Sequence, residues 1–597
     1  MNLVATVSAK DNHASARGSS QERVAEEASA GLPTPTGDVP LPSHSASPVT
    51  DHDVGDETEI GSRVYFGQQS VMRFRPRSPS TTRQHSSTQK HRAEVYSEAE
   101  TTMFRSIIKS WTTPSPSLGT ILIDLYFSKL FVHAPIFDPS DFHPGHSSQL
   151  LHQAVYFCGS LMRPCSSYTG NITSQELFGR IKLLIYFRPE NDMFTVLKAL
   201  CSLSCWSLLV PQRATLDSPW QWVGQAIRLA VQLGLHKEET YLSMPRSACA
   251  RRIWWFLQRS ETILALCKGR PAMLQKHSVQ LPQVSDFESP SVDAISFCYT
   301  TKLFEQALRK IEKLAASGQD ASAQDILSLL DALAQWTDKL PDELRMYSKD
   351  GKGPRPHSRV VSNAHKILFV SIILVSHLPG ASRRNSMLHA TAAAASSCLA
   401  RIYEEILHRD EVAYLLPADA WFMLVCGGAG IYCSSPAEDK GRSSRAEVEI
   451  LRGVLTQMAT KYPSAQVAME TLDRMQQDMS RKDERPGPPT NFDEPSVGAG
   501  RNFSSLSQSR HLEATEGIQF DFRSLFPVPN EFCAALGSIE RASVGLNPVM
   551  PDLMPGNMGQ QDLGLMLQWS DLTFENFDAD SLELMGFGEE QSTLWPA

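Results

Sequence analysis

Apolar residues recur at the three- and four-residue spacing of amphipathic helices over most of the chain, from Ala99 to about Met479. Alternating, strand-like segments are few here, and short Gly-, Pro- or polar stretches separate the helical ones. We therefore predict an all-α fold, a large helical array, over residues 96–480. Besides the two helices discussed next, the pattern predicts helices at residues 121–132, 177–187, 194–209, 295–314, 326–340, 367–378, 392–407 and 421–433.

The clearest predicted helix starts after Ser218, whose hydroxyl suits an N-cap, with Pro219 at the first helical position. Gly234 follows the last turn, where a left-handed residue is expected, and Leu235 is placed to fold back onto that turn. The apolar stripe of this helix consists of Val223, Ile227, Ala230 and Leu233.

A second long helix is predicted from about residue 245 to residue 268, and Gly269 and Pro271 end it. Trp254 and Trp255 point to different sides of such a helix, so we expect them to pack against two neighbouring helices. Its apolar face is formed by Ile253, Leu257, Leu264 and Cys267.

Residues 1–95 are rich in Ser, Thr, Pro, Ala and charge, with few large apolar side chains, so we expect them to be disordered. A basic stretch at residues 71–93 contains no acid and carries Arg73, Arg75, Arg77, Arg83, Lys90 and Arg92. Such a stretch suits a nuclear import receptor or a phosphate backbone. A solvated basic linker explains the same composition, and both interpretations stay open.

Residues 481–560 begin with a Pro-, Gly- and Ser-rich string and are expected to form a flexible linker. No Lys or Arg follows Arg541, and residues 561–597, called here the acidic-aromatic segment, mix acids with large apolar residues. Its apolar members include Trp569, Leu572, Phe574, Phe577, Leu582, Leu584, Met585 and Phe587. Repulsion between the acids keeps such a segment open, which leaves its aromatic rings available to a groove on a coactivator. Docking onto the chain's own helical domain is the alternative.

The 597 residues carry a net charge of −9 with 42% hydrophobic residues, a balance that fits a soluble protein and does not by itself favour a nucleic-acid partner. The N-terminus lacks an apolar core of secretory length, and the most apolar run, residues 367–378, is too short to span a bilayer. We therefore expect an intracellular protein without a membrane partner. The 11 cysteines begin at Cys158 in apolar surroundings, which predicts buried thiols rather than disulfides.

Three short motifs follow one another between Trp220 and Pro271: an A-I-R-x-A-x-x-L-G-L-H block, an R-R-x-W-W block and a G-R-P turn. Together they resemble the middle homology region of fungal binuclear zinc-cluster (Zn2Cys6-type) transcription factors, and weaker likenesses extend over roughly residues 60–480. The matching residues are Ala226, Ile227, Arg228, Leu233, Gly234, Leu235, His236, Arg251, Arg252, Trp254, Trp255, Gly269, Arg270 and Pro271. Glu261 and Thr262 replace the family's usual Asp-Arg pair, which predicts one weaker internal ion pair.

The resemblance implies a helical regulatory domain in a nuclear regulator of RNA polymerase II promoters, and not an enzyme. An activator role is expected from the acidic-aromatic segment, with specialised metabolism or nutrient use as candidate pathways. We expect Arg251 and Arg252 to form internal salt bridges rather than to meet phosphate. His236 is expected to cap a helix end or to lie in the core rather than to bind a metal.

The family's DNA-binding module holds two zinc ions with six cysteines, usually near the N-terminus. No cysteine precedes Cys158, so we expect neither the zinc cluster nor another cofactor within these residues. Promoter DNA is then reached through a zinc cluster outside this sequence, or indirectly by a co-regulator that acts with a DNA-binding partner. The sequence leaves homodimer and heterodimer formation open.

A metal-dependent enzyme is the rival class, and its best candidate site is the string HAPIFDPSDFHPGH. The donors in it are His133, Asp138, Asp141, His143 and His146. Repeated prolines and the likeness to the family's entry turn favour a surface loop over a metal site.

Overall fold

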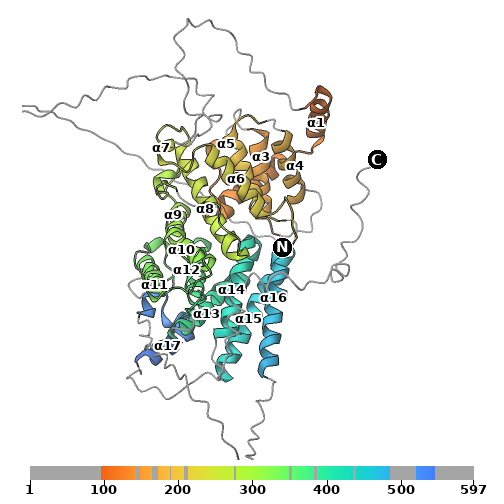
Figure 1. Ribbon diagram of the computed structural model, residues 1–597. Helices are drawn as coiled ribbons and strands as arrows, with labels where there is room; N and C mark the ends of the chain where they lie inside the picture. Colours follow the sequence, from red (N-terminus) through yellow and green to blue (C-terminus); the bar gives the residue numbers. More distant parts are fainter. Residues whose placement is uncertain are drawn as a thin grey trace, which may run out of the picture. The chain divides into compact units, whose positions relative to one another are not determined.

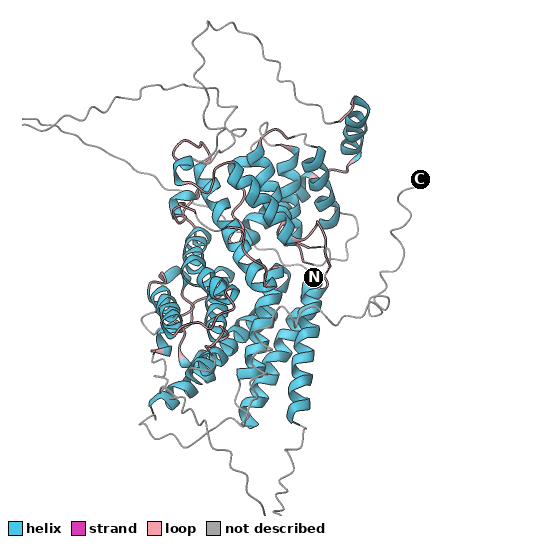
Figure 2. Ribbon diagram, viewed as in Figure 1, coloured by secondary structure: helices cyan, strands magenta, loops and turns pink. Residues whose placement is uncertain are grey.

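The computed structural model describes residues 96–483 and 520–544, apart from gaps at 143–147, 165–171, 188–189, 208–212, 275–276, 349–352, 382–385 and 434–437. Helices and connecting turns make up these residues, and no strand occurs among them (Figure 2). Strand-like pairing in the described part is limited to one isolated bridge between Tyr347 and Pro354. The prediction of an all-α fold is confirmed.

The first part of the domain runs from α1 to α8 and contains the helices that carry the family motifs. Helices α2, α3, α4, α5 and α6 pack in succession, and α6 also contacts α8. These helices are α1 (Glu98–Ser110), α2 (Pro116–Leu125), α3 (Gln149–Leu161), α4 (Ser174–Phe187), α5 (Met193–Leu203), α6 (Pro219–Gln232), α7 (Glu238–Tyr241) and α8 (Ser247–Lys268).

The second part is built around α12, whose side chains are almost all buried. This helix has the length and apolar composition of a membrane span, but 83% of it is buried inside the protein, where it serves as a core helix. Helices α12 to α16 pack against one another (Figure 1). The helices of this part are α9 (Val292–Leu303), α10 (Arg309–Ala316), α11 (Ala323–Asp338), α12 (Arg359–Ser376), α13 (Ser386–His408), α14 (Pro417–Cys433), α15 (Glu438–Ala459) and α16 (Pro463–Asp483).

Local signals place α6 as expected. The Ser218 hydroxyl accepts a hydrogen bond from the Gln221 amide (3.3 Å), and Pro219 occupies the first turn. Gly234 has a positive φ of 81°, and the Leu235 amide donates back to the Ala230 carbonyl oxygen (2.9 Å). The left-handed conformation of Gly234 and the hydrogen bond from Leu235 close the helix end in the way that the sequence predicts.

Two predicted helices have different limits in the structure. Residues 295–314 are not one regular helix, because α9 ends at Leu303 and a π-helical turn (η6, Phe304–Leu308) precedes α10. Residues 194–209 contain α5, which ends at Leu203. The ten cysteines within the described residues are all free thiols, and six of them are buried.

Part of the expected linker is folded. Residues 520–544 lie inside the 481–560 segment, yet they form two 3-10 turns, η9 (Phe522–Leu525) and η10 (Asn530–Phe532), and helix α17 (Ala534–Val544). Turn η9 packs on α11, and α17 packs on α13. The expectation of a flexible linker is wrong for these residues because their apolar side chains are buried in the common core: Phe522, Leu525, Phe526, Val528, Cys533, Leu536 and Ile539.

Candidate functional site

Most of the family-motif residues on α6 and α8 are part of the hydrophobic core. Ala226, Ile227 and Leu235 are buried, as are both tryptophans, whereas Arg228 is exposed on α6. The Trp255 indole donates to the Gln280 carbonyl oxygen (2.8 Å). Both Trp rings lie against the ring of His277, at centroid distances of 5.6 and 5.2 Å.

The arginine pair at the start of α8 is held inside the domain. Arg251 forms an ion pair with Glu238 (2.8 Å), and hydrogen bonding from Arg251 holds the pKa of Glu238 below its usual value. Arg252 is 1% exposed, pairs with Asp138 and donates to the carbonyl oxygen of Pro135 (3.2 Å). This geometry agrees with the expectation of internal salt bridges.

His236 and Glu261 organise the turns that follow their helices. The His236 carbonyl oxygen accepts from the Ser278 amide (3.3 Å), and burial lowers the pKa of the His236 ring. Glu261 accepts from the amides of Met273 (2.6 Å) and Leu274 (2.9 Å). The carboxylate that departs from the family pattern therefore shapes the chain just after Pro271.

The candidate metal ligands do not converge within the described residues. Asp138 pairs with Arg252, and Asp141 pairs with Lys198 (2.5 Å). His143 and His146 lie outside the described residues. No group of three or more His, Cys, Asp or Glu side chains in the described part is placed to hold a metal ion.

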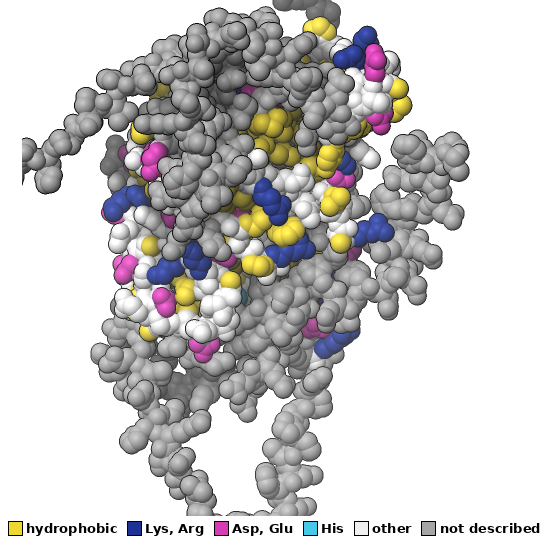
Figure 3. Space-filling model, turned by 45° about the horizontal axis from the view of Figure 1, so that its top comes forward, with side chains coloured by type: hydrophobic (Ala, Val, Ile, Leu, Met, Phe, Trp, Pro, Cys, Tyr) yellow, Lys and Arg dark blue, Asp and Glu magenta, His cyan; other side chains and the backbone are white. Residues whose placement is uncertain are grey.

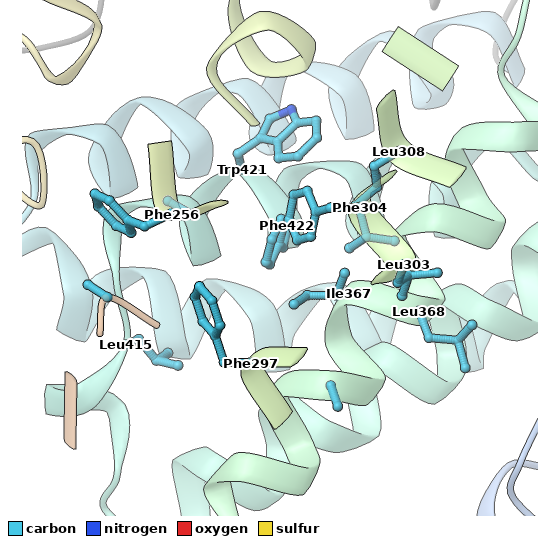
Figure 4. Close-up of a cluster of buried hydrophobic side chains, with 14 of the residues drawn as sticks. Phe256, Phe297, Leu303, Phe304, Leu308, Ile367, Leu368, Leu415, Trp421 and Phe422 are labelled. Carbon is cyan, nitrogen blue, oxygen red and sulfur yellow. The ribbon is translucent and has the colours of Figure 1, made fainter. Parts of the chain in front are cut away.

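A cavity of about 490 Å³ lies where the first turns of α6, α14 and α16 meet the side of α8. Its wall is mostly apolar, and Figure 4 shows several of its side chains close together in the core. The apolar lining includes Phe256, Ile263, Leu264, Phe304, Ile367, Trp421 and Phe422. A cavity of this size and composition lies in the range of pockets that bind small organic molecules.

Charge on the cavity wall is predominantly positive. Four basic side chains line it, Arg213, Arg259, Lys268 and Arg270, against the single carboxylate of Asp419. That carboxylate is already engaged by Lys366 and accepts from the Tyr403 hydroxyl (3.0 Å). Elsewhere, on the face in Figure 3, Lys and Arg side chains also lie beside hydrophobic ones.

Arg259 differs from every other buried basic side chain that the structure describes. It makes no ion pair and no hydrogen bond with another described residue, and its Nη1 atom is buried without a partner. Its neighbours are the rings of Phe297 and Phe304, with centroids 4.8 and 5.0 Å from the guanidinium carbon. By contrast, an ion pair or a hydrogen bond to a carbonyl oxygen serves Arg180, Lys198, Arg252, Arg309 and Lys366.

Two neutral donors share the cavity wall with Arg259. The Nδ2 atom of Asn363 and the Nε1 atom of Trp421 are buried without hydrogen-bond partners. His133 also lines the cavity, and burial lowers its pKa to about 3, so its ring is neutral at physiological pH. The one buried charge on the wall that lacks a counter-charge is therefore that of Arg259.

The sequence does not reveal this cavity, because helices that are distant in sequence form it. One signal was present in the pattern. Arg259 follows Arg252 by seven residues, so both share a side of α8 with Phe256 and Ile263. An arginine on an apolar helix face either pairs with a carboxylate of the protein or is available to bind an anionic ligand.

The remaining predicted residues lie outside the part that the structure describes. They are the basic stretch at residues 71–93 and the acidic-aromatic segment at residues 561–597. Arg270, of the G-R-P turn, does lie at the cavity, with its guanidinium carbon 5.0 Å from the centroid of the Trp220 ring. Gly269 before it ends α8 with a positive φ of 60°.

Comparison with known proteins places this helical domain in a family. Residues 123–343 match the fungal specific transcription factor domain. Over these residues the chain is similar to fungal transcription factors, and the relatives that it matches are named as transcription regulators, not as enzymes.

Two relatives show the extent of the likeness. The Cutinase transcription factor 1 beta of Fusarium vanettenii is 25% identical over 209 residues, 32% of this chain and 23% of that protein. The Acetamidase regulatory protein of Emericella nidulans is 26% identical over 262 residues, 41% of this chain and 32% of that protein. The match thus spans a quarter to a third of these relatives' length, and no solved structure matches the chain.

Proposed function

We propose that this chain regulates transcription from RNA polymerase II promoters in the nucleus, as an activator of a restricted set of genes. The observation that carries the proposal is the fungal transcription factor domain at residues 123–343 together with the acid-rich, base-free composition of residues 561–597. The relatives named for a cutinase and an acetamidase support a pathway-specific role. Whether that pathway is nutrient use or specialised metabolism follows from the genes that respond.

The division of labour follows from where the functional side chains lie. Most motif residues of α6 and α8, with the exception of Arg228, are committed to internal contacts, so the helical domain does not offer them to DNA. Promoter contact then requires a zinc cluster outside residues 1–597 or a DNA-binding partner, because no cysteine precedes Cys158. Nuclear import is assigned to the basic stretch at residues 71–93.

A reporter assay tests the activator role. Residues 561–597 are fused to a foreign DNA-binding domain, and we expect reporter expression well above that of the DNA-binding domain alone. Replacing Trp569, Phe574 and Phe577 by Ala removes the rings that a coactivator groove would bury, so activation falls although every acid remains. The matched control replaces Ser570, Thr573 and Asn576 by Ala, and it keeps activity. Equal activity of the two triple variants, or none in the parent fusion, contradicts the proposal.

A further inference from the structure

We propose that the cavity between α6, α8, α14 and α16 binds a small, largely apolar molecule with one carboxylate group, and that Arg259 is the counter-ion of that carboxylate. Binding itself is independent of the proposed transcriptional role. Only its consequence, control of the regulator by a small acid, rests on that role. The two can therefore fail separately.

The need for an anion comes from Arg259. Its side chain is 6% exposed, it lines the cavity, and it forms no hydrogen bond or ion pair with a described oxygen atom. Burial lowers the pKa of Arg259 to about 9, and the neighbouring group that opposes the shift is the Cys298 thiol rather than a carboxylate. The guanidinium group still carries its charge at neutral pH, so a ligand with a negative charge completes the site.

The number and type of donors favour a carboxylate. Arg259 supplies one buried positive charge and a planar fork of N–H donors, which matches the two oxygens of one carboxylate. Asn363 on α12 and Trp421 on α14 also line the cavity, and each carries a buried neutral N–H donor without a partner. A dianionic phosphate would bring a second charge into a wall where Arg213 and Arg270 are exposed and shared with water.

The backbone adds to the preference for negative charge. Helices α6, α14 and α16 all begin at the cavity, where Ser218, Pro417 and Ser464 belong to its lining. The amino-terminal end of a helix carries a partial positive charge. The carboxyl end of α8 also reaches the cavity, but Lys268 and Arg270 lie there and offset its partial negative charge.

The rest of the ligand is defined by the walls. Phe256, Phe304, Ile367 and Phe422 line the cavity, and Figure 4 shows their side chains in the core, so hydrocarbon or an aromatic ring fits beyond the carboxylate. A volume of about 490 Å³ admits a bicyclic aromatic acid or a medium-chain fatty acid and excludes a folded macromolecule.

The test measures binding to the purified full chain by titration calorimetry, with two carboxylates and their uncharged counterparts. The pairs are 2-naphthoate with 2-naphthalenemethanol, and decanoate with 1-decanol. We expect at least one carboxylate to bind with one-to-one stoichiometry and at least tenfold more tightly than its alcohol. Arg259→Met should abolish this preference, whereas Arg180→Met, at a buried arginine outside the cavity, should preserve it.

Three outcomes overturn the proposal. The first is that neither carboxylate binds with a Kd below about 1 mM, which is roughly the weakest binding at which a specific site is still detected. The second is that the alcohols bind as tightly as the acids. The third is that carboxylates bind only after residues 561–597 are deleted, since the acidic-aromatic segment, and not a small molecule, would then be the occupant. Circular dichroism of each variant separates lost binding from lost folding.

Discussion

Arg252 and Arg259 lie two turns apart on α8 and are both buried, yet one has partners and the other has none. The same substitution at the two positions therefore isolates the effect of the partner. Arg252→Met leaves the Asp138 carboxylate, whose side chain is 14% exposed, without its cation. Breaking a buried pair in this way costs about 3–5 kcal/mol of unfolding free energy.

Arg259→Met should cost far less in the ligand-free protein. Replacing an unpaired buried charge by an apolar side chain of similar length removes a desolvation cost of several kcal/mol. Against this stands the loss of the cation–π contacts with Phe297 and Phe304, each worth about 2 kcal/mol when desolvated. The two effects nearly cancel, so we expect a difference of roughly 3–5 kcal/mol between the two variants.

Chemical denaturation of the full chain is the suitable assay. For a folded part of roughly 400 residues, the unfolding entropy is about 0.8 kcal/mol/K, so a thermal midpoint moves only about 1 °C per kcal/mol. The guanidinium midpoint, followed by far-UV circular dichroism, distinguishes the two variants more clearly. If Arg259→Met destabilises the protein as much as Arg252→Met does, Arg259 is paired in the folded state, and the argument for an anionic ligand fails.

Three further predictions use other contacts of the same domain. Asp419→Asn removes the charge that pairs with Lys366, whose side chain is 4% exposed. We expect it to lower the unfolding free energy measured in urea by about 3–5 kcal/mol, and adding Lys366→Met should restore part of this loss; an unchanged midpoint would contradict the prediction. Gly159→Ala places a Cβ onto the Leu122 carbonyl oxygen between α3 and α2, so it should lower the unfolding free energy by about 1–3 kcal/mol. Gly179→Ala on α4 meets open space and should be neutral or stabilising, so equal effects of the two variants would refute the packing. Burial lowers the pKa of His133 to about 3 and of His365 to about 4, both below the ordinary value of 6.5. As the pH falls, the two rings take up protons in the unfolded chain before they do so in the folded protein. The unfolding free energy should therefore be highest above about pH 6.5 and should fall between pH 6.5 and 4, by up to about 1.4 kcal/mol per pH unit for each ring. His365→Gln should flatten this dependence in midpoints measured at pH 7.5 and 5.0, and a slope equal to that of the parent would be against it.

Local chemistry explains which parts of the fold could be predicted. Helix α6 is specified by its own residues, because Ser218, Pro219 and Gly234 encode its ends. The π-helical turn at Phe304–Leu308 is different, since apolar spacing alone does not distinguish a bulged helix from a regular one. Residues 520–544 were missed because their burial depends on α11 and α13, whereas the neighbouring sequence has the composition of a linker.

The site was less accessible to prediction than the fold. The motif residues that attract notice in the sequence, such as Arg252 and Trp254, turn out to hold the domain together. The side chains that make the cavity distinctive are Arg259, Asn363 and Trp421, and they come from three helices. No spacing in the sequence reports that their donors lack partners, because a missing partner is a property of the packed structure.

The packing of residues 520–544 on α11 and α13 sets the range over which the acidic-aromatic segment operates. Counted from the end of α16 at Asp483, Trp569 is 86 residues away (569 − 483), a span of at most roughly 300 Å. Counted from the end of α17 at Val544, it is 25 residues away (569 − 544), at most roughly 90 Å. Because α17 attaches the chain to the helical domain a second time, it shortens the maximal distance between the domain and the acidic-aromatic segment. Any partner that the segment recruits is then held near the domain for which we propose binding of a small acid.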